Sequence, residues 1–498
     1  MNVNPITRLD YPDPDVIRVE DTYYMVSTTM HFMPGCEILQ SFDLVHWEHV
    51  TYVYETLDHT DAQQLKSGQN IYGQGMWAAS LRYHEGRFCI CFVANDTRKT
   101  YLYTSEKIDG PWKKQLIEGF YHDGSLLFDE DGRNYIVYGN DEIWITELNE
   151  DLTAPKKDGL HRLLVSDHKN PELGYEGSHI QKINGYYYIF LIHSLRDRWM
   201  RTEACFYSDS LEGEFTGGDV LCDDRGYCGQ GVAQGGIVDT PDGKWYAMLF
   251  QDSGAVGRIP ILVPVTWKDH FPVFGQNGHV PEEIEVHSTR PGYIYQPLVG
   301  SDDFCNGLLP RWQFNHDPDP RYYHLDALQG TYTITTREVC TELTQAVNTL
   351  TQRMSYPSCA AEVTVDASAL KEGDVAGLCA LQSCYAAVGI TKHHGKYEVL
   401  MLDKKEDGIL DMTDGTVVES HQMDFRLEAD FCNMKDEARC YYRVNKGDWL
   451  PIGTVHKLYF KLDHFTGCRF GLFCYAAEET GGSACFRDFK YYDVDEIS

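Results

Sequence analysis

A short pattern recurs five times in the first half of the chain. Each copy is a tight turn containing Gly or Asp, followed by a run of aromatic and β-branched residues that favours a strand. The copies lie at residues 21–26, 86–90, 132–137, 185–190 and 243–248, spaced by about 46 to 65 residues. Repeats of this length with several short strands each indicate propeller blades or solenoid units. Five blades that close into a ring are the most economical architecture.

The second half of the chain lacks this pattern. With 498 residues the chain is too long for one hydrophobic core. A Pro- and Gly-rich passage follows residue 270, and segments such as 331–336, 360–365 and 458–462 then alternate with period two, as half-buried antiparallel strands do. We therefore predict an all-β protein, with a five-bladed β-propeller over residues 1–295 and a β-sandwich over residues 300–498. One short helix is expected, opened by the capping-box pattern at residues 60–63.

Composition excludes several classes of function. The formal charge of −32 repels phosphate backbones and anionic lipids, so neither nucleic acid nor a membrane is an expected partner. The N-terminal sequence has no basic segment followed by an apolar stretch. The 16 Cys are scattered, without a CxxC pair, and many lie in apolar runs. We therefore expect a cytoplasmic protein whose thiols are reduced and buried. The oligomeric state is left open, with a homo-oligomer as one alternative.

Three acidic residues occupy matched places in successive repeats. Asp13 lies in Tyr11-Pro12-Asp13-Pro14, Asp123 in His122-Asp123-Gly124-Ser125, and Glu176 in Tyr175-Glu176-Gly177-Ser178, each about ten residues before a hairpin signal. Equivalent strand ends of different blades converge on the axis of a propeller. Convergent carboxyl groups are what the hydrolysis of a glycosidic bond requires.

The surroundings of the three residues suggest their roles. Two prolines hold Asp13 rigidly, which suits a general base aimed at one water. Asp123 would raise the pKa of Glu176 through like-charge repulsion and keep it protonated as the general acid. Each residue taken alone reads more simply as a turn or cap residue. The matched positions of all three favour the catalytic interpretation.

An ordered set of motifs over nearly the whole chain resembles glycoside hydrolase family 43 of the β-xylosidase and α-L-arabinofuranosidase type. In the second half, Trp312-Gln313-Phe314-Asn315-His316 and Gly373-Asp374-Val375-Ala376-Gly377-Leu378 resemble the concanavalin-like sandwich of its β-xylosidase-like members. The motifs of the first half, besides the three around Asp13, Asp123 and Glu176, are Pro34-Gly35-Cys36-Glu37-Ile38, Ser41-Phe42-Asp43-Leu44-Val45-His46-Trp47, Met76-Trp77-Ala78-Ala79-Ser80 and Gln234-Gly235-Gly236.

The resemblance implies an inverting, exo-acting glycosidase that releases a terminal pentose, β-D-xylose or α-L-arabinofuranose, from hemicellulose-derived oligosaccharides. It assigns the general base to Asp13, the general acid to Glu176 and the tuning of that acid to Asp123. It also implies substrate contacts from four further residues. These are Phe32, Trp77, Gln234 and Arg258.

No cofactor is expected for the reaction. The chain departs from the family at Ala233, where a His that can serve an axial calcium ion is frequent, and at Ala79, where proline is usual. Ala233 cannot bind a metal, so an axial ion held through it is not expected. A structural calcium in the sandwich is an alternative, with Asp302, Asp303 and Asp488 as its oxygen ligands.

Two other functions remain open at this point. The chain could be a non-catalytic carbohydrate-binding protein, although it keeps all three acidic residues. The fructan hydrolases and transferases also have five blades, and they use an acid in a Glu-Cys pair. The nearest match here is Glu203-Ala204-Cys205, which carries an inserted residue.

Overall fold

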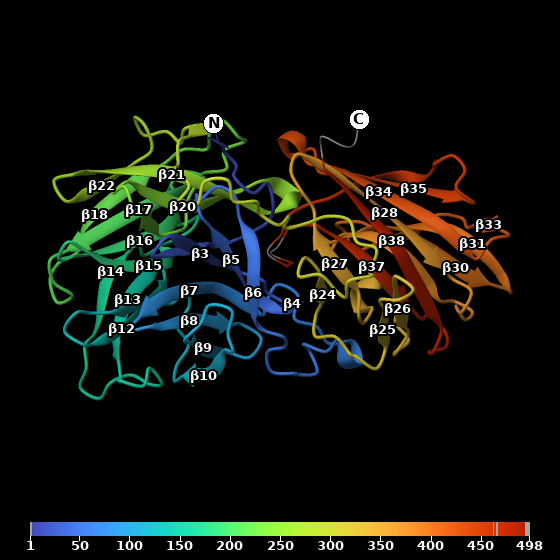
Figure 1. Ribbon diagram of the computed structural model, residues 1–498, viewed down its shortest axis with the longest axis horizontal. Coiled ribbons are helices and arrows are strands. Elements are labelled where there is room, and N and C mark those ends of the chain that lie inside the picture. Colours follow the sequence, from blue (N-terminus) through green and yellow to red (C-terminus); the bar gives the residue numbers. More distant parts are fainter. Residues whose placement is uncertain (1, 462, 465–466, 494–498) are drawn as a thin grey trace.

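The computed structural model describes residues 2–461, 463–464 and 467–493 as two β-domains side by side (Figure 1). In these residues helical structure is limited to four 3-10 turns, and no helix is long and apolar enough to cross a membrane. All 16 cysteines are free thiols, most of them buried. The 3-10 turns are η1 (Lys66–Gly68), η2 (Gly254–Val256), η3 (Leu343–Gln345) and η4 (Cys432–Met434).

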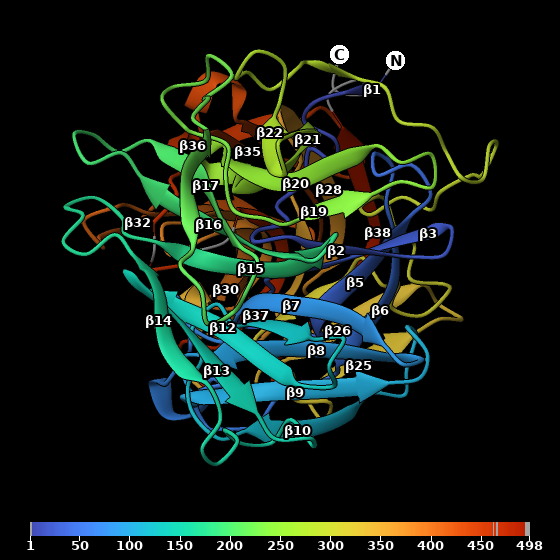
Figure 2. The ribbon, with the colours of Figure 1, turned by 90° about the vertical axis from the view of Figure 1, so that its left-hand side faces the viewer.

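The N-terminal domain is a ring of five antiparallel sheets with four strands each. Figure 2 looks onto this ring, with β2, β7, β15 and β19 near its middle. The strands, in order from the axis outward, are β2 (Asp15–Val19), β3 (Thr22–Ser27), β5 (Gly35–Ser41) and β6 (Glu48–Tyr54) in blade 1; β7 (Met76–His84), β8 (Arg87–Ala94), β9 (Lys99–Ser105) and β10 (Lys113–Ile117) in blade 2; β11 (Ser125–Phe128), β12 (Asn134–Asn140), β13 (Glu142–Leu148) and β14 (His161–Ser166) in blade 3; β15 (Glu176–Ile183), β16 (Tyr186–Ser194), β17 (Arg201–Ser208) and β18 (Thr216–Leu221) in blade 4; and β19 (Ile237–Asp239), β20 (Trp245–Asp252), β21 (Arg258–Lys268) and β22 (Phe271–Phe274) in blade 5.

Apolar contacts between neighbouring blades hold the ring together. Each pair of adjacent blades shares one buried cluster, so both faces of a sheet are covered. This explains why the recurring strands are continuous apolar runs instead of alternating ones. The ring closes between blades 5 and 1, where the Asn4 amide donates to the Leu262 carbonyl at 2.9 Å and accepts from its N–H at 3.0 Å.

The C-terminal domain is a sandwich of two antiparallel sheets around one large core. One sheet contains β32 (Leu410–Met412), β31 (Lys396–Lys404), β30 (Ala386–His393), β29 (Val375–Leu381), β37 (Arg469–Tyr475), β27 (Leu350–Arg353), β24 (Gln313–Asn315) and β4 (Phe32–Met33), with β33 (Thr416–Val418) beside β31. The other contains β25 (Tyr323–Asp326), β26 (Thr331–Thr335), β38 (Ser483–Asp493), β28 (Ser358–Asp366), β34 (Gln422–Asp430), β35 (Glu437–Val444) and β36 (Leu450–Lys457). The remaining pair, β1 (Asn2–Val3) and β23 (Glu283–Ile284), ties the N-terminus to the segment after blade 5.

The two domains are joined by backbone pairing and by buried charges. Strand β4 comes from the blade 1 region but forms the edge of a sandwich sheet, against β24. Arg353 of the sandwich forms an ion pair with Glu37 at 2.8 Å and donates to the Asp10 carbonyl at 2.9 Å. Its guanidinium also lies 4.1 Å from the centre of the Tyr11 ring. The propeller and the sandwich therefore share a continuous buried interface.

The predicted fold class and five-bladed arrangement are confirmed, and the boundary predicted between residues 295 and 300 falls in the connection from β23 to β24. The helix predicted from residue 60 is wrong. Thr60 does accept the capping bond from the Gln63 N–H at 3.1 Å, but Leu65 and Ser67 have φ values of 52° and 53°. A left-handed backbone cannot continue an α-helix, so only η1 forms.

The strand predicted at 458–462 is also wrong. β36 ends at Lys457, residues 458–461 leave the sheet, and residue 462 lies outside the described residues. Leu458 turns into the core, where it is fully buried. The chain then reaches the propeller, because the Gly467 N–H donates to an Asp10 oxygen at 2.7 Å. An interdomain contact thus replaces the expected sheet pairing.

Replacing Arg353 by Met should destabilise the protein by about 3–5 kcal/mol, because it removes the arginine partner of the buried Glu37 carboxylate, which keeps only His49 at 3.0 Å. Urea unfolding followed by fluorescence measures the loss. The matched control is Arg321→Met, since Arg321 pairs with Asp319 at 2.7 Å but its side chain is 73% exposed. The control should leave the unfolding midpoint unchanged. Equal effects of the two changes would contradict this account of the interface.

Candidate active site

The five inner strands begin with the same backbone feature, at one end of the propeller axis. A residue with positive φ stands at or just before the start of each strand, and β7 and β15 open with a β-bulge. The five residues are Asp13, Gly75, Asp123, Gly177 and Gln234. Such positions are strained for side chains other than Gly and are characteristic of functional sites. The kink and the bulge re-aim neighbouring side chains, which brings acidic residues far apart in sequence toward one place.

Asp13 is held on both carboxylate oxygens. It precedes β2, has φ of 52° and is 4% exposed. The Thr28 hydroxyl donates to Oδ2 at 2.7 Å, and Arg258 Nη1 donates to Oδ1 at 2.7 Å. The carbonyl of Pro12 accepts from the Ser27 hydroxyl at 2.6 Å, which fixes the loop itself. The carboxylate is therefore rigidly oriented.

Asp123 and Glu176 lie on either side of His122. His122 Nε2 is 3.5 Å from Oδ2 of Asp123 and 3.6 Å from Oε2 of Glu176. The Gly177 N–H donates to Asp123 at 2.9 Å, and the Asn140 amide donates to Glu176 at 2.8 Å. Blades 3 and 4 thus supply two acids and a base that form one compact group.

Burial and mutual charge set the protonation of this group. Burial alone would lower the pKa of His122, but the charges of Asp123 and Glu176 raise that pKa to about 9. Burial raises the pKa of Asp123 to about 6, with a further rise from Glu176 and Asp13 that His122 opposes. Burial also acts to raise the pKa of Glu176, yet this pKa lies below its usual value because His122 and two arginines stabilise the carboxylate.

The sequence expectation that Asp123 raises the pKa of Glu176 is therefore not met in this arrangement. The raised pKa belongs to Asp123, and the proton of the group is held mainly by His122. The three side chains lie close enough to share one proton. His122 and Asp123 thus hold a proton within reach of Glu176.

Two arginines connect this group to Asp13. Arg201 and Arg258 are the first residues of β17 and β21, equivalent places in blades 4 and 5. Asp252 links them, accepting from Arg201 Nε at 2.7 Å and lying 3.3 Å from Arg258 Nε. Both guanidiniums face the ring of Phe250, at 5.4 Å and 4.7 Å. Both also act on the charge of Glu176. Asp13 of blade 1 and Glu176 of blade 4 thus both interact with the buried charge of Arg258.

Comparisons with known proteins agree with this geometry. The sequence model of glycosyl hydrolases family 43 matches residues 3–272, and that of the β-xylosidase C-terminal concanavalin A-like domain matches residues 301–492. The chain belongs to glycosyl hydrolase family 43. A β-xylosidase of Formosa agariphila is 26% identical over 99% of this chain and 89% of its own length.

Two solved structures are similar over the whole chain. A bifunctional GH43-CE protein of Bacteroides eggerthii superimposes with a TM-score of 0.93 and 42% identity over 100% of this chain, which spans 64% of that protein. A GH43 glycoside hydrolase engineered to display both endo-xylanase and exo-arabinofuranosidase activity has a TM-score of 0.86 and 27% identity over 99% of both chains. The family match makes this chain a glycosidase acting with inversion, and the fructan hydrolase alternative is left without support.

Gln234 and Glu203 form a buried support beneath the acids of this family 43 glycosidase. The Gln234 N–H donates to Glu203 Oε2 at 2.7 Å. Burial raises the pKa of Glu203 well above its usual value, so it is a neutral carboxylic acid, not a second acid in the reaction. A side chain at Gly177 would collide with Gln234 Cγ at 2.7 Å. The predicted substrate contact at Gln234 stays a prediction, and its side chain packs on the backbone beside Glu176.

The predicted pocket aromatics have different surroundings. Trp77 is half-buried and its ring meets that of His122 edge-on at 5.8 Å. Phe32 is fully buried, with the guanidinium of Arg469 from the sandwich 3.5 Å from its ring centre. Phe460, also from the sandwich, lies with its ring centre 5.9 Å from the Arg258 guanidinium. The sandwich therefore approaches the site from the side of blades 1 and 5.

The potential metal ligands were also located. Among the described residues, the only group of three or more His, Cys, Asp or Glu whose ligand atoms converge is His122, Asp123 and Glu176. In the sandwich, Asp302 accepts hydrogen bonds on both oxygens, from the Phe304 N–H at 2.7 Å and Trp312 Nε1 at 2.8 Å. Calcium binding by Asp302, Asp303 and Asp488 stays a prediction.

Polar side chains of the inner strands meet on the propeller axis between the acids and a cavity of about 410 Å³ that these strands line toward the far end of the ring. Ala233 is buried and its backbone pairs with Phe250. Arg82 of blade 2 reaches the axis, forming an ion pair with Asp15 at 2.8 Å and donating to the Ser125 hydroxyl at 2.7 Å. His179 completes the set, 3.1 Å from Asp15. A guanidinium therefore supplies positive charge where blades 1 to 4 meet.

Replacing His122 by Asn should shift the alkaline limb of the pH profile of kcat/KM. In the wild type the group loses its proton as pH rises through about 9, the pKa of His122. In the variant the proton is held by the carboxyl pair alone, so the alkaline limb should move to lower pH, although to above about 6 because His122 no longer lowers the pKa of Asp123. Profiles measured with an oligosaccharide substrate check this.

The control for this profile is His84→Asn. His84 is the last residue of β7, so it lies at the opposite end of the axis, where it stacks on Phe128 at 4.6 Å. Its replacement should leave both limbs in place. An unchanged alkaline limb in the His122 variant would show that His122 does not hold the proton.

Proposed function

We propose that this family 43 glycosidase removes single pentose units, β-D-xylose or α-L-arabinofuranose, from the non-reducing ends of hemicellulose-derived oligosaccharides. The observation that carries the proposal is the buried Arg258, which pairs with Asp13 at 2.7 Å and also acts on the charge of Glu176. The relatives named β-xylosidase and exo-arabinofuranosidase support this substrate class.

In the proposed reaction, Asp13 is the general base. It takes a proton from a water molecule, whose oxygen attacks the anomeric carbon from the face opposite the leaving group. The bonds from Thr28 and Arg258 leave the carboxylate a single orientation, so the water is held in line for attack.

Glu176 is the general acid on the other side of the scissile bond. As that bond breaks, the leaving oxygen receives a proton from Glu176, which draws it from the group shared with His122 and Asp123. The positive charges of Arg201 and Arg258 offset the negative charge that two carboxylates would otherwise concentrate there. Water and two carboxyl groups supply the whole reaction, which therefore needs no cofactor.

Contacts from the sandwich support exo action. Arg469 closes over Phe32, and Phe460 faces Arg258, so the sandwich limits the site on the side of blades 1 and 5. A site limited on one side admits the end of a sugar chain and not its middle. The substrates we propose are short oligosaccharides in the cytoplasm.

Two assays test the proposed function. Wild-type enzyme should hydrolyse nitrophenyl β-xyloside or nitrophenyl α-L-arabinofuranoside, and proton NMR of fresh product should show the inverted anomer. Inactivity on both substrates, combined with measurable binding of pentose oligosaccharides, would favour a carbohydrate-binding protein instead. A retained anomer would refute the assignment of Asp13 as a base.

Replacing Asp13 by Ala should lower kcat by about 10²–10⁴-fold on every substrate, because no other group is placed to activate the water. Circular dichroism should show the same fold, because Asp252 still lies 3.3 Å from Arg258 Nε and keeps that buried cation paired, while loss of the ion pair to Asp13 lowers the stability. The control Asp131→Ala removes an exposed turn carboxylate and should leave kcat unchanged. Comparable losses in the two variants would contradict the role of Asp13.

Replacing Glu176 by Ala should separate substrates by leaving group. Hydrolysis of xylobiose or arabinobiose needs a proton on the leaving oxygen and should slow by about 10²–10⁴-fold. Hydrolysis of a dinitrophenyl glycoside needs no such proton and should slow by less than tenfold. Equal losses on both substrates would mean that Glu176 is not the acid.

A further inference from the structure

The connection from β16 to β17 exposes a tryptophan at the same end of the propeller as the acids. β16 ends at Ser194 and β17 begins at Arg201, while Glu176, at the start of β15, pairs with Ile192 of β16. Trp199 lies in this six-residue connection, and its side chain is 43% exposed. An indole combines a large apolar face with a polar N–H, which suits it to binding surfaces.

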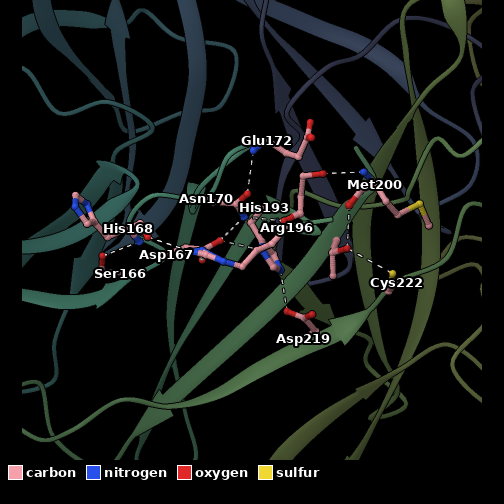
Figure 3. A network of polar contacts seen from close by, with 12 residues as sticks. Ser166, Asp167, His168, Asn170, Glu172, His193, Arg196, Met200, Asp219 and Cys222 are labelled. Atoms are coloured by element: carbon pink, nitrogen blue, oxygen red, sulfur yellow. Dashed lines mark hydrogen bonds and ion pairs between the residues drawn. The ribbon is translucent and has the colours of Figure 1, made fainter. Parts of the chain in front are cut away.

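A network of polar contacts holds this connection in place (Figure 3). His193 lies between two carboxylates, 3.2 Å from Asp167 and 2.8 Å from Asp219. Arg196 donates to Asp167 at 3.2 Å, and the Ser194 hydroxyl accepts from the Met200 N–H at 2.7 Å. These contacts join the segments before β15 and after β16. They therefore fix both ends of the short stretch between Arg196 and Met200.

Trp199 is connected to the catalytic group through one residue. The Arg201 guanidinium lies 5.1 Å from the centre of the Trp199 ring, in cation–π distance. The same guanidinium donates to Asp252 at 2.7 Å and acts on the charge of Glu176. Arg201 is 5% exposed, so it covers the inner face of the indole while the outer part of Trp199 faces solvent.

The chemistry of the reaction indicates what would lie on this exposed face. A general acid must stand beside the oxygen of the leaving group. Glu176 comes from blade 4, so the leaving sugar departs over blade 4, the blade that carries Trp199. Phe460 and Arg469 of the sandwich approach the site from blades 5 and 1, and blade 5 is the neighbour of blade 4 in the ring. The aromatic face of Trp199 therefore lies on the blade that holds the general acid.

We propose that Trp199 is a stacking platform for the first sugar on the leaving-group side of the scissile bond. The ring of a pentopyranose or pentofuranose has a C–H face that packs on an indole, and Arg201 beneath the indole fixes its tilt. Trp199 thereby sets the preference for oligosaccharides over glycosides with small leaving groups. This inference rests on the proposed function.

The test compares two substrates of the wild-type enzyme and of Trp199→Ala. One is xylobiose or arabinobiose, whichever the wild type cleaves faster, and the other is the matching glycosyl fluoride, whose leaving group does not reach Trp199. The variant should lose about tenfold in kcat/KM on the disaccharide, and less than twofold on the fluoride. Trp199→Leu, which keeps apolar bulk without an aromatic face, should behave like the Ala variant, and Trp199→Phe should recover most of the activity.

Tyr83→Ala is the matched control, since Tyr83 is 45% exposed near the end of β7, at the far end of the axis. It should leave both substrates unaffected. Equal losses on the disaccharide and the fluoride in the Trp199 variants would overturn the proposal, because they would show that Trp199 acts only by supporting Arg201 and Glu176. Absence of any loss would overturn it as well. A wild type that cleaves neither substrate would instead refute the proposed function itself.

Discussion

The buried ion pair between Arg258 and Asp13 is the contact on which the site depends. Both side chains are 4% exposed, and their charges lie 2.7 Å apart between blades 5 and 1, where the ring closes. A buried charge without its partner is strongly unfavourable, so the pair requires the two ends of the propeller to meet. Asp252 extends the contact to Arg201 of blade 4. The contacts that close the ring between blades 5 and 1 therefore also orient the base, Asp13, relative to the acid, Glu176.

The fold was largely predictable because the packing of blades requires the same strand pattern to recur along the sequence. Each sheet is covered on both faces, so each blade repeats an apolar strand after a tight turn. Asp13, Asp123 and Glu176 could be found for the same reason, since they stand at matched points of the repeat. The two wrong predictions of secondary structure concern segments whose local sequence pattern is overridden by contacts with distant residues. The cap at Thr60 forms without its helix, and residues 458–461 leave the sheet to meet the propeller.

The residues that support the acids were harder to anticipate. His122 stood in a recognised motif without a role, and nothing in its neighbourhood indicated a pKa of about 9. Arg201 and Asp252 lie at the ends of strands in different blades, and their relation exists only in three dimensions. Trp199 sits in a connection without repeat character. Charged residues that interact across blades are not separated by a fixed number of residues in the sequence. Their interactions can therefore be recognised only in the folded ring.

Strand β4 has a consequence for how this protein can be divided. Phe32 and Met33 belong to the propeller by chain order, yet their backbone is the outermost row of a sandwich sheet, paired with β24. Cutting the chain between the domains would strip that row of its neighbour and uncover Phe32 together with unpaired amide and carbonyl groups. An isolated propeller would expose an unpaired strand edge at Phe32 and Met33, which favours aggregation. The catalytic unit is thus the whole chain. Recombining the propeller with a different second domain would require a new partner for the edge of β4.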